Sequence, residues 1–232
     1  MTYNVLYDGD WDAVRALILS NPVDILCLQE VAEEAFPSRR VIRQSMVREA
    51  VPWASEYAPL WHRSPRRIGN MTLVLGSIKK GHILSTPVSQ PYGLVNEVEV
   101  GGARLTVANI HMTEMLGPPP VAFPVSEVLR LREAIDLTRR FSRCRNPVIA
   151  LGDFNTFWPA PACWVLRRAW RDCRTVAGGR HAATRRTYGL PFVIDHIFVR
   201  GGANVLDYRV IEGGGSDHRA VVARLEVPIL RP

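Results

Sequence analysis

Short apolar runs typical of β-strands recur along the chain and constrain its fold more than any other feature. They cover residues 3–7, 24–28, 71–76, 94–100, 105–111, 147–151, 193–199, 205–211 and 220–227. Residues 95–100 and 104–111 follow each other across Gly101-Gly102 and predict a hairpin, whereas helical patterns at residues 11–19, 37–51, 125–141 and 159–170 separate other runs. This mixed order favours an α/β fold, a four-layer α/β/β/α sandwich with two packed mixed β-sheets, over a doubly wound parallel sheet.

The length of 232 residues is consistent with a single domain over residues 1–232, and 47% hydrophobic residues supply a sizeable core. In the last helix we expect Trp164, Val165 and Leu166 to face inward. Three connections are longer than a compact fold requires, and we expect substrate contacts there: residues 52–70, 113–124 and 178–191.

The sequence shows no apolar run near 18 residues and no signal-peptide pattern, which predicts a cytoplasmic monomer without a transmembrane segment. The first strand is short, so either it is truly brief or the natural chain begins upstream of Met1. Four cysteines without C-x-x-C spacing indicate free thiols in a reducing compartment rather than a zinc site.

The net charge of +7 is compatible with a nucleic-acid partner. Only Lys79 and Lys80 among the 29 basic residues are lysines, and the arginines are spread along the chain rather than gathered in one run. Such a skew resembles a compositional bias of the genome, so charge alone supports nucleic-acid binding weakly.

Polar side chains stand at the ends of several apolar runs, where a fold alone gives little reason for them. They are Asn4, Glu30, Asn109, His111, Asp153, Asn155, Asp195, Asp217 and His218. Hydrolysis of a phosphate ester needs charge neutralisation, an activated water and a stabilised leaving oxygen, and a divalent cation held by a few carboxylates can serve all three. Each residue alone is equally compatible with a surface or turn position.

Spacing predicts two local arrangements within this set. In an extended backbone Asp153 and Asn155 point to the same side, although Gly, Asp and Asn are also turn formers. Asp217 and His218 are adjacent and point to opposite sides, which leaves Asp217 free for a metal. Asp195 lies inside an apolar run, where a carboxylate is costly unless paired, and His218 is its natural partner.

Together these segments resemble the endonuclease/exonuclease/phosphatase superfamily. The motifs run in the family's order: Tyr-Asn-Val-Leu at 3–6, Leu-Gln-Glu at 28–30, Asn-Ile-His at 109–111, Gly-Asp-Phe-Asn at 152–155, Ile-Asp-His-Ile-Phe at 194–198 and Ser-Asp-His at 216–218. Any one of them is weak, but six in order over nearly the whole chain are specific.

The resemblance implies a metal-dependent hydrolase of phosphoric esters that uses Mg²⁺ or Mn²⁺. It implies Glu30 as the main metal ligand, with Asn4 and Asp217 close to the metal. Asp153 and Asn155 would orient the attacking water and the phosphate. His218, held by Asp195, would act as the general base or bind the scissile phosphate, and His111 would hydrogen-bond a phosphate oxygen or assist the leaving group.

The sequence leaves the substrate open. A nuclease acting on nucleic-acid phosphodiesters is the leading hypothesis, because basic and aromatic residues fall in the long connections. The predicted substrate contacts are Asn109, Arg63, Arg66, Arg67, Arg185 and Arg186. The alternatives are a sphingomyelinase-like enzyme or a small-molecule phosphodiesterase or phosphatase, and, from another class, a non-catalytic binding module on the same scaffold.

Overall fold

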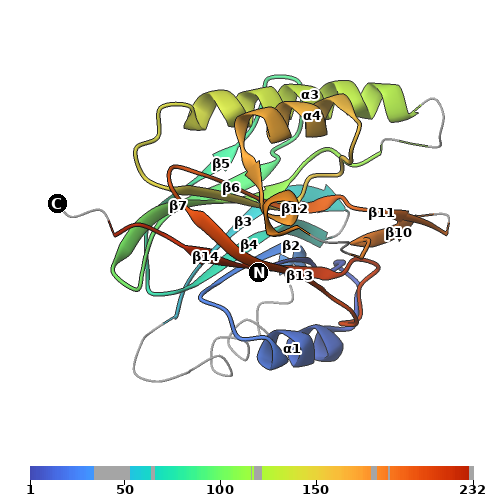
Figure 1. Ribbon diagram of the computed structural model, residues 1–232. Coiled ribbons are helices and arrows are strands. Elements are labelled where there is room, and N and C mark those ends of the chain that lie inside the picture. Colours follow the sequence, from blue (N-terminus) through green and yellow to red (C-terminus); the bar gives the residue numbers. More distant parts are fainter. Residues whose placement is uncertain are drawn as a thin grey trace.

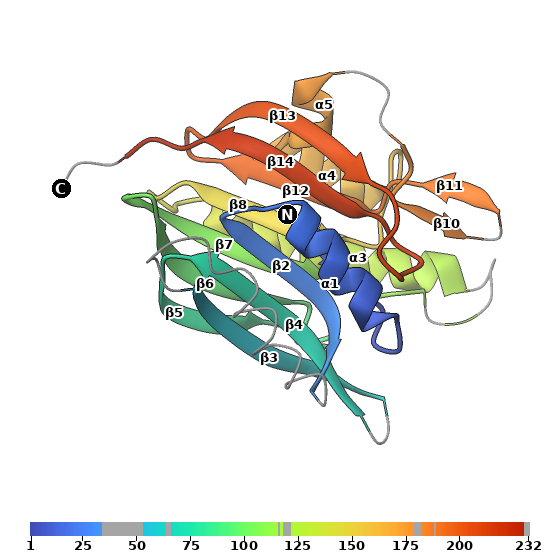
Figure 2. The ribbon, with the colours of Figure 1, turned by 90° about the horizontal axis from the view of Figure 1, so that it is seen from below.

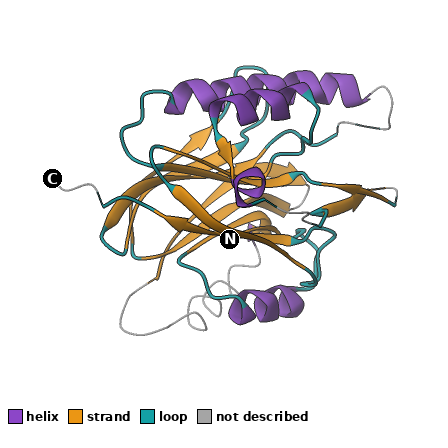
Figure 3. Cartoon of the chain, viewed as in Figure 1, coloured by secondary structure: helices purple, strands orange, loops and turns teal. Residues whose placement is uncertain are grey.

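The fold is a sandwich of two β-sheets with helices on both outer faces (Figure 1). The computed structural model describes residues 1–33, 53–63, 66–115, 117, 122–178, 182–187 and 189–229. Figure 3 shows the strands between an upper and a lower helical layer. The four-layer α/β/β/α prediction is confirmed, and both sheets mix parallel and antiparallel pairs.

The first sheet has six strands in the order β13-β14-β1-β2-β4-β3. They are β1 (Thr2–Asn4), β2 (Ile25–Ala32), β3 (Trp53–Arg63), β4 (Arg66–Leu75), β13 (Asn204–Ile211) and β14 (Ala220–Glu226). β1 and β2 are parallel, and the remaining pairs are antiparallel.

The second sheet also has six strands, in the order β5-β6-β7-β8-β12-β9. They are β5 (Ser77–Leu84), β6 (Gly93–Val100), β7 (Ala103–His111), β8 (Val148–Asp153), β9 (Arg171–Asp172) and β12 (Asp195–Arg200). The predicted hairpin across Gly101-Gly102 is present as β6–β7, and β7 and β8 are parallel. A separate small hairpin joins β10 (Arg185–Thr187) and β11 (Leu190–Phe192).

Helix α1 (Trp11–Ser20) covers the outer face of the first sheet, across which it lies in Figure 2. Its N-cap is Asp10, whose carboxylate accepts the backbone N–H groups of Asp12 and Ala13 at 3.0 and 3.1 Å. The apolar positions Val14, Leu17 and Ile18 are buried against the first sheet, as the 3.6-residue period requires.

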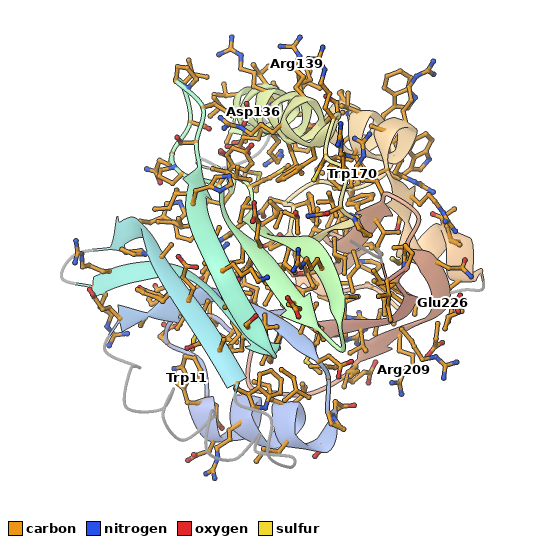
Figure 4. All side chains as sticks on the ribbon, turned by 90° about the vertical axis from the view of Figure 1, so that its left-hand side faces the viewer. Trp11, Asp136, Arg139, Trp170, Arg209 and Glu226 are labelled. Atoms are coloured by element: carbon orange, nitrogen blue, oxygen red, sulfur yellow. The ribbon has the colours of Figure 1, made fainter. Side chains whose placement is uncertain are left out.

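Helices α3 (Ala122–Phe141) and α4 (Pro161–Ala169) cover the second sheet, and the short helix α5 (Cys173–Ala177) follows β9. Figure 4 shows Asp136 and Arg139 in this helical layer, at the opposite side of the molecule from Trp11. The expectation that Trp164 faces inward is wrong. Cys163 and Leu166, three positions apart, form the buried stripe of α4, while Trp164 is 48% exposed and lies beside the guanidinium of Arg168.

The apolar core has three layers, one under each helical layer and one between the sheets. Strand β2 shows how the sequence serves two of them: Leu26 and Leu28 face α1, whereas Cys27 faces the second sheet. This is the two-residue period of a strand buried on both faces. All four cysteines are free, as expected.

Two of the long connections contain more regular structure than the sequence predicted. Strands β3 and β4 lie in and beyond the first of these connections and pair with each other, and the connection at residues 178–191 contains β10 and the start of β11. Strand β5 was also missed, and the helix predicted at residues 37–51 lies outside the described residues. Among the described helices, none is long and apolar enough to cross a membrane.

Candidate active site

The strand order brings the predicted polar residues to one edge of the sandwich. The parallel pairs β1–β2 and β7–β8 end at this edge, and His111 and Asp153 are register partners there. Strand β12 runs antiparallel to β8 and begins at Asp195, directly opposite Asp153. His218 lies just before β14, so the edge where β14 begins carries it as well.

Asn4 connects the two sheets at the centre of the site. Its side-chain Nδ2 donates to Glu30 Oε1 at 3.0 Å and to Asp153 Oδ2 at 3.1 Å. Its Oδ1 accepts the backbone N–H of Leu6 at 3.1 Å. One lone pair of this oxygen is therefore occupied, and the fully buried Asn4 holds two carboxylates side by side.

Glu30 projects from an irregular point of β2. The register with β4 shifts between Leu28 and Val31, and Glu30 has a φ of 56°, in the left-handed region that non-glycine residues rarely adopt. The bulge turns the carboxylate toward Asn4 while its neighbours stay in the ladder. Backbone strain of this kind is typical of functional positions.

Asp153 lies at the centre of the acidic set and is 1% exposed. Burial and the nearby Asp195 carboxylate raise the pKa of Asp153, against the opposing effect of His218 and His111. Its Oδ2 lies 3.7 Å from the Nε2 atoms of both histidines. The carboxylate thus faces two imidazoles and the amide of Asn4 without being fully neutralised.

His218 and Asp195 form the predicted buried pair. His218 Nδ1 lies 3.0 and 2.9 Å from the two carboxylate oxygens of Asp195. Burial lowers the pKa of His218, but the carboxylates of Asp195 and Asp153 outweigh burial and raise it to about 9. The other ring nitrogen, Nε2, has no hydrogen-bond partner among the described residues and faces Asp153.

Two hydroxyl groups that we did not single out from the sequence hold this pair in place. Ser216 Oγ donates to the carbonyl oxygen of Asn4 at 2.7 Å and accepts the N–H of His218 at 3.1 Å. Thr184 Oγ1 accepts the N–H groups of Ile194 and Asp195, both at 3.1 Å. Ser216 belongs to the Ser-Asp-His motif and could have been found there, whereas nothing in the local sequence marks Thr184.

His111 and Asn155 lie beside Asp153, on the side away from Asp195. His111 Nε2 is 3.9 Å from Glu30 Oε1, and its ring meets the ring of Trp61 edge-on at a centroid distance of 4.5 Å. Asn155 does not continue an extended strand as expected, because its φ is 49°. Its N–H donates to Asp153 Oδ1 at 2.9 Å, and its Nδ2 donates to the carbonyl oxygen of Met112 at 3.0 Å.

Asp217 is not free, contrary to the expectation. Its Oδ2 accepts from a terminal guanidinium nitrogen of Arg185 at 2.6 Å, and its side chain is 39% exposed. Burial alone lowers the pKa of Arg185, but the carboxylates of Asp217 and Asp153 outweigh it and raise the pKa above its usual range. Of the arginines predicted to contact substrate, Arg185 is therefore the one that the structure places beside the acidic residues of the site.

The other predicted substrate contacts lie away from the acidic centre. Asn109 is fully buried between the sheets, where its amide donates to the carbonyl oxygens of Leu28 and Met71 and accepts from Gln29. It is a core residue, and the prediction that it contacts substrate is wrong. Arg66, Arg67 and Arg186 are exposed, with Arg67 3.6 Å from the Glu33 carboxylate, and the side chain of Arg63 is outside the described part of the chain.

The donor set fits a hard divalent cation. Glu30, Asp153 and Asp217 offer carboxylate oxygens, which Mg²⁺ and Mn²⁺ prefer. Asp153, Asp195 and His218 also place ligand atoms within 4.8 Å of one another, but His218 and Asp195 already bond to each other. Burial is the main reason that the pKa of Asp153 is raised, and a cation beside the carboxylate would stabilise its charged form.

Comparison with known proteins identifies relatives of this architecture. The structure is similar to an endonuclease/exonuclease/phosphatase family protein from Leptotrichia buccalis (TM-score 0.76, 16% identity, 97% of this chain and 98% of that one). It is also similar to the 3'-5' exonuclease NExo from Neisseria meningitidis (TM-score 0.73, 19% identity, 97% and 98%). A third similar structure is the 3' phosphatase NExo from Neisseria bound to product DNA hairpin (TM-score 0.69, 21% identity, 97% and 98%).

At these identities the likeness establishes the fold alone, and no curated protein matches the sequence. The sequence model of the family described as "Endonuclease/Exonuclease/phosphatase family" matches residues 1–218 of the chain. This range contains every strand-end residue of the site. By sequence and by fold, the chain belongs to the endonuclease/exonuclease/phosphatase family.

Proposed function

We propose that this protein is a divalent-metal-dependent phosphoesterase that hydrolyses phosphodiester bonds in nucleic acid. The observation that carries the proposal is the convergence of Glu30, Asp153 and the Asp195–His218 pair at one edge of the sandwich, joined by Asn4. The similarity to an exonuclease and to a DNA-bound phosphatase supports nucleic acid as the substrate class.

A Mg²⁺ or Mn²⁺ ion would be held by Glu30 with Asp217 nearby, and it would neutralise phosphate charge and acidify a water molecule. Asn4 keeps Glu30 and Asp153 close despite their like charge. Asp153 is placed to accept the proton of the attacking water, because burial raises its pKa and makes it a better base.

His218 is best suited to bind the scissile phosphate. With a pKa of about 9 its imidazole is charged at neutral pH, and the unpartnered Nε2 can donate to a phosphate oxygen. Asp195 orients the ring through Nδ1. Of the two roles left open by the sequence, phosphate binding therefore has the stronger support, and Arg185 adds a second positive charge beside Asp217.

The test is hydrolysis of single-stranded DNA, duplex DNA, RNA and sphingomyelin vesicles with Mg²⁺, Mn²⁺ or EDTA. We expect metal-dependent cleavage of a nucleic acid, and a loss of about 10²-fold or more in kcat for Asp153→Asn. The matched control is Asp172→Asn, which alters another buried carboxylate, one that caps α5.

Hydrolysis of sphingomyelin without hydrolysis of any nucleic acid would indicate that the substrate is a lipid head group. Metal-loaded, folded protein that hydrolyses none of these substrates would contradict the proposed function.

A further inference from the structure

A pocket of about 300 Å³ opens directly beside the catalytic carboxylates. Glu30 and His111 belong to its lining, so the pocket is continuous with the site. Trp61 from the β3–β4 hairpin, Tyr92 from the β5–β6 connection and Glu133 from α3 form other walls. The proposed hydrolysis gives no role to this space.

Contacts with neighbouring residues hold the aromatic walls of the pocket in place. Trp61 packs against the small cluster of Ala58, Leu60 and Leu94, and its ring meets His111 edge-on at 4.5 Å. Tyr92 is 1% exposed, and its hydroxyl donates to Asp136 at 2.5 Å. A wall that is already ordered loses little conformational entropy on binding.

The charge of the pocket is opposite to that of the chain as a whole. None of the described residues that line it is an arginine or a lysine, although the net charge of the chain is +7. Three glutamates, Glu30, Glu114 and Glu133, line it instead. A second phosphate in this space would approach carboxylates, with no arginine or lysine among the described lining residues to bind it, so the pocket suits an uncharged group.

Polar groups and size restrict that group further. Ser89, Gln90 and Thr113 line the pocket and provide hydroxyl and amide groups for hydrogen bonds. The buried His111 Nδ1 has no hydrogen-bond partner among the described residues. The volume lies at the lower end of the range of about 300–1,000 Å³ for small-ligand sites, which accommodates one planar base with its sugar but not a stacked chain.

We propose that this pocket holds the terminal nucleoside of a nucleic-acid chain, with the base against Trp61 and its phosphate at Glu30 and Asp153, so that the enzyme removes residues from an end. A chain that continued through the pocket would place its next phosphate among the glutamates. The rest of the polymer extends instead on the side of Arg185, which is not part of the pocket lining. This inference rests on the proposed function and specifies that cleavage starts from an end of the nucleic-acid chain.

The experiment compares linear with circular single-stranded DNA of the same length. We expect release of mononucleotides from the linear substrate and at least tenfold slower cleavage of the circle. Methyl p-nitrophenyl phosphate has no strand ends, so its hydrolysis reports phosphodiesterase activity independently of the shape of the DNA. If that ester is hydrolysed while circle and linear strand are cleaved at the same rate, the pocket proposal is overturned and the proposed function stands.

Substitution of Trp61 tests the pocket itself. Trp61→Leu keeps the apolar packing but removes the aromatic face, and we expect KM for linear DNA to rise roughly 5- to 150-fold, the equivalent of about 1–3 kcal/mol of base stacking. Trp61→Phe keeps an aromatic face and should restore most of the affinity for linear DNA.

Trp164→Leu is the matched control, because Trp164 is exposed on α4 and does not line the pocket. Equal changes in KM for the Trp61 and Trp164 variants would overturn the proposal. If the wild-type protein hydrolyses none of these substrates, the result contradicts both the proposed function and the pocket assignment.

Discussion

Replacing Asp195 by asparagine should change how the stability of the metal-free protein depends on pH. The fully buried Asp195 contacts His218 Nδ1 through both carboxylate oxygens, at 3.0 and 2.9 Å. Asparagine has nearly the same shape and keeps one acceptor oxygen, so Asp195→Asn removes the charge while disturbing the packing little. The variant therefore isolates the electrostatic part of the pair.

The size of the effect follows from the pKa of His218, which rises from 6.5 to about 9 on folding. Each pKa unit corresponds to about 1.4 kcal/mol, so the charged imidazole stabilises the fold by roughly 3 kcal/mol. Because the folded pKa is raised, this contribution is fully present below pH 6.5 and is lost as the pH rises through 9. Asp153, whose pKa is also raised, favours the protonated folded state in the same direction.

The measurement is urea unfolding in EDTA at intervals from pH 5.5 to 9.5, for the wild type and for Asp195→Asn. We expect the free energy of unfolding of the wild type to fall across this range and that of the variant to change much less. The difference between the two proteins cancels the groups that Asp195 does not influence, and it retains His218 together with Asp153, whose pKa Asp195 also raises. Parallel curves for the two proteins would refute the view that Asp195 holds His218 in its charged form.

Three further predictions concern the cation, the strand ends and the core. Mg²⁺ or Mn²⁺ at 100 times its Kd should raise the free energy of unfolding by about 2.7 kcal/mol in a urea titration, and Glu30→Gln should abolish most of this gain while the control Glu33→Gln keeps it. Gly152→Ala should destabilise far more than Gly101→Ala in the same assay, because a Cβ at Gly152 would lie 1.9 Å from a carbonyl oxygen of β7 whereas Gly101 has open space; equal losses would contradict the close approach. Asn109→Ala should cost about 1–3 kcal/mol of stability by leaving buried polar groups unpaired, and it should leave KM nearly unchanged, as steady-state kinetics of the folded variant can check.

The residues of the candidate site were predictable because burying a carboxylate is costly. Asp195 stands inside an apolar run, so the sequence itself demands a partner, and His218 is that partner in the structure. The separate partners of Asp217 and His218, which are Arg185 and Asp195, do not follow from strand alternation, because both residues precede β14 and Asp217 Oδ1 lies 3.9 Å from His218 Nε2. The left-handed backbone of Glu30 and Asn155 could not be predicted from the alternation of side chains, because no side-chain pattern encodes a positive φ at a non-glycine residue.

The strands that the sequence missed lie at the edges of the sheets. β3 is the last strand of its sheet and contains Pro59, next to a shift in register, where a missing N–H is tolerated. β5 is the edge of the other sheet and carries Lys79 and Lys80. Charged and proline residues protect exposed edges and at the same time weaken the apolar alternation by which a strand is recognised. The ion pair of Arg185 with Asp217 joins residues 32 positions apart and depends on the tertiary fold.

The chemistry of this site depends on the packing of the two sheets, because each sheet supplies half of it. Asn4 and Glu30 come from the first sheet, His218 comes from the segment just before its strand β14, and Asp153 and Asp195 come from the second sheet. A buried polar contact lies just beneath them, where Gln29 Nε2 donates to Asn109 Oδ1 at 2.7 Å across the interface. Apolar side chains would allow the sheets to slide by small amounts, whereas a buried hydrogen bond is lost if they do. The Gln29–Asn109 bond therefore stabilises the packing of the two sheets, while Asn4, bonded to both carboxylates, sets the close approach of Glu30 and Asp153.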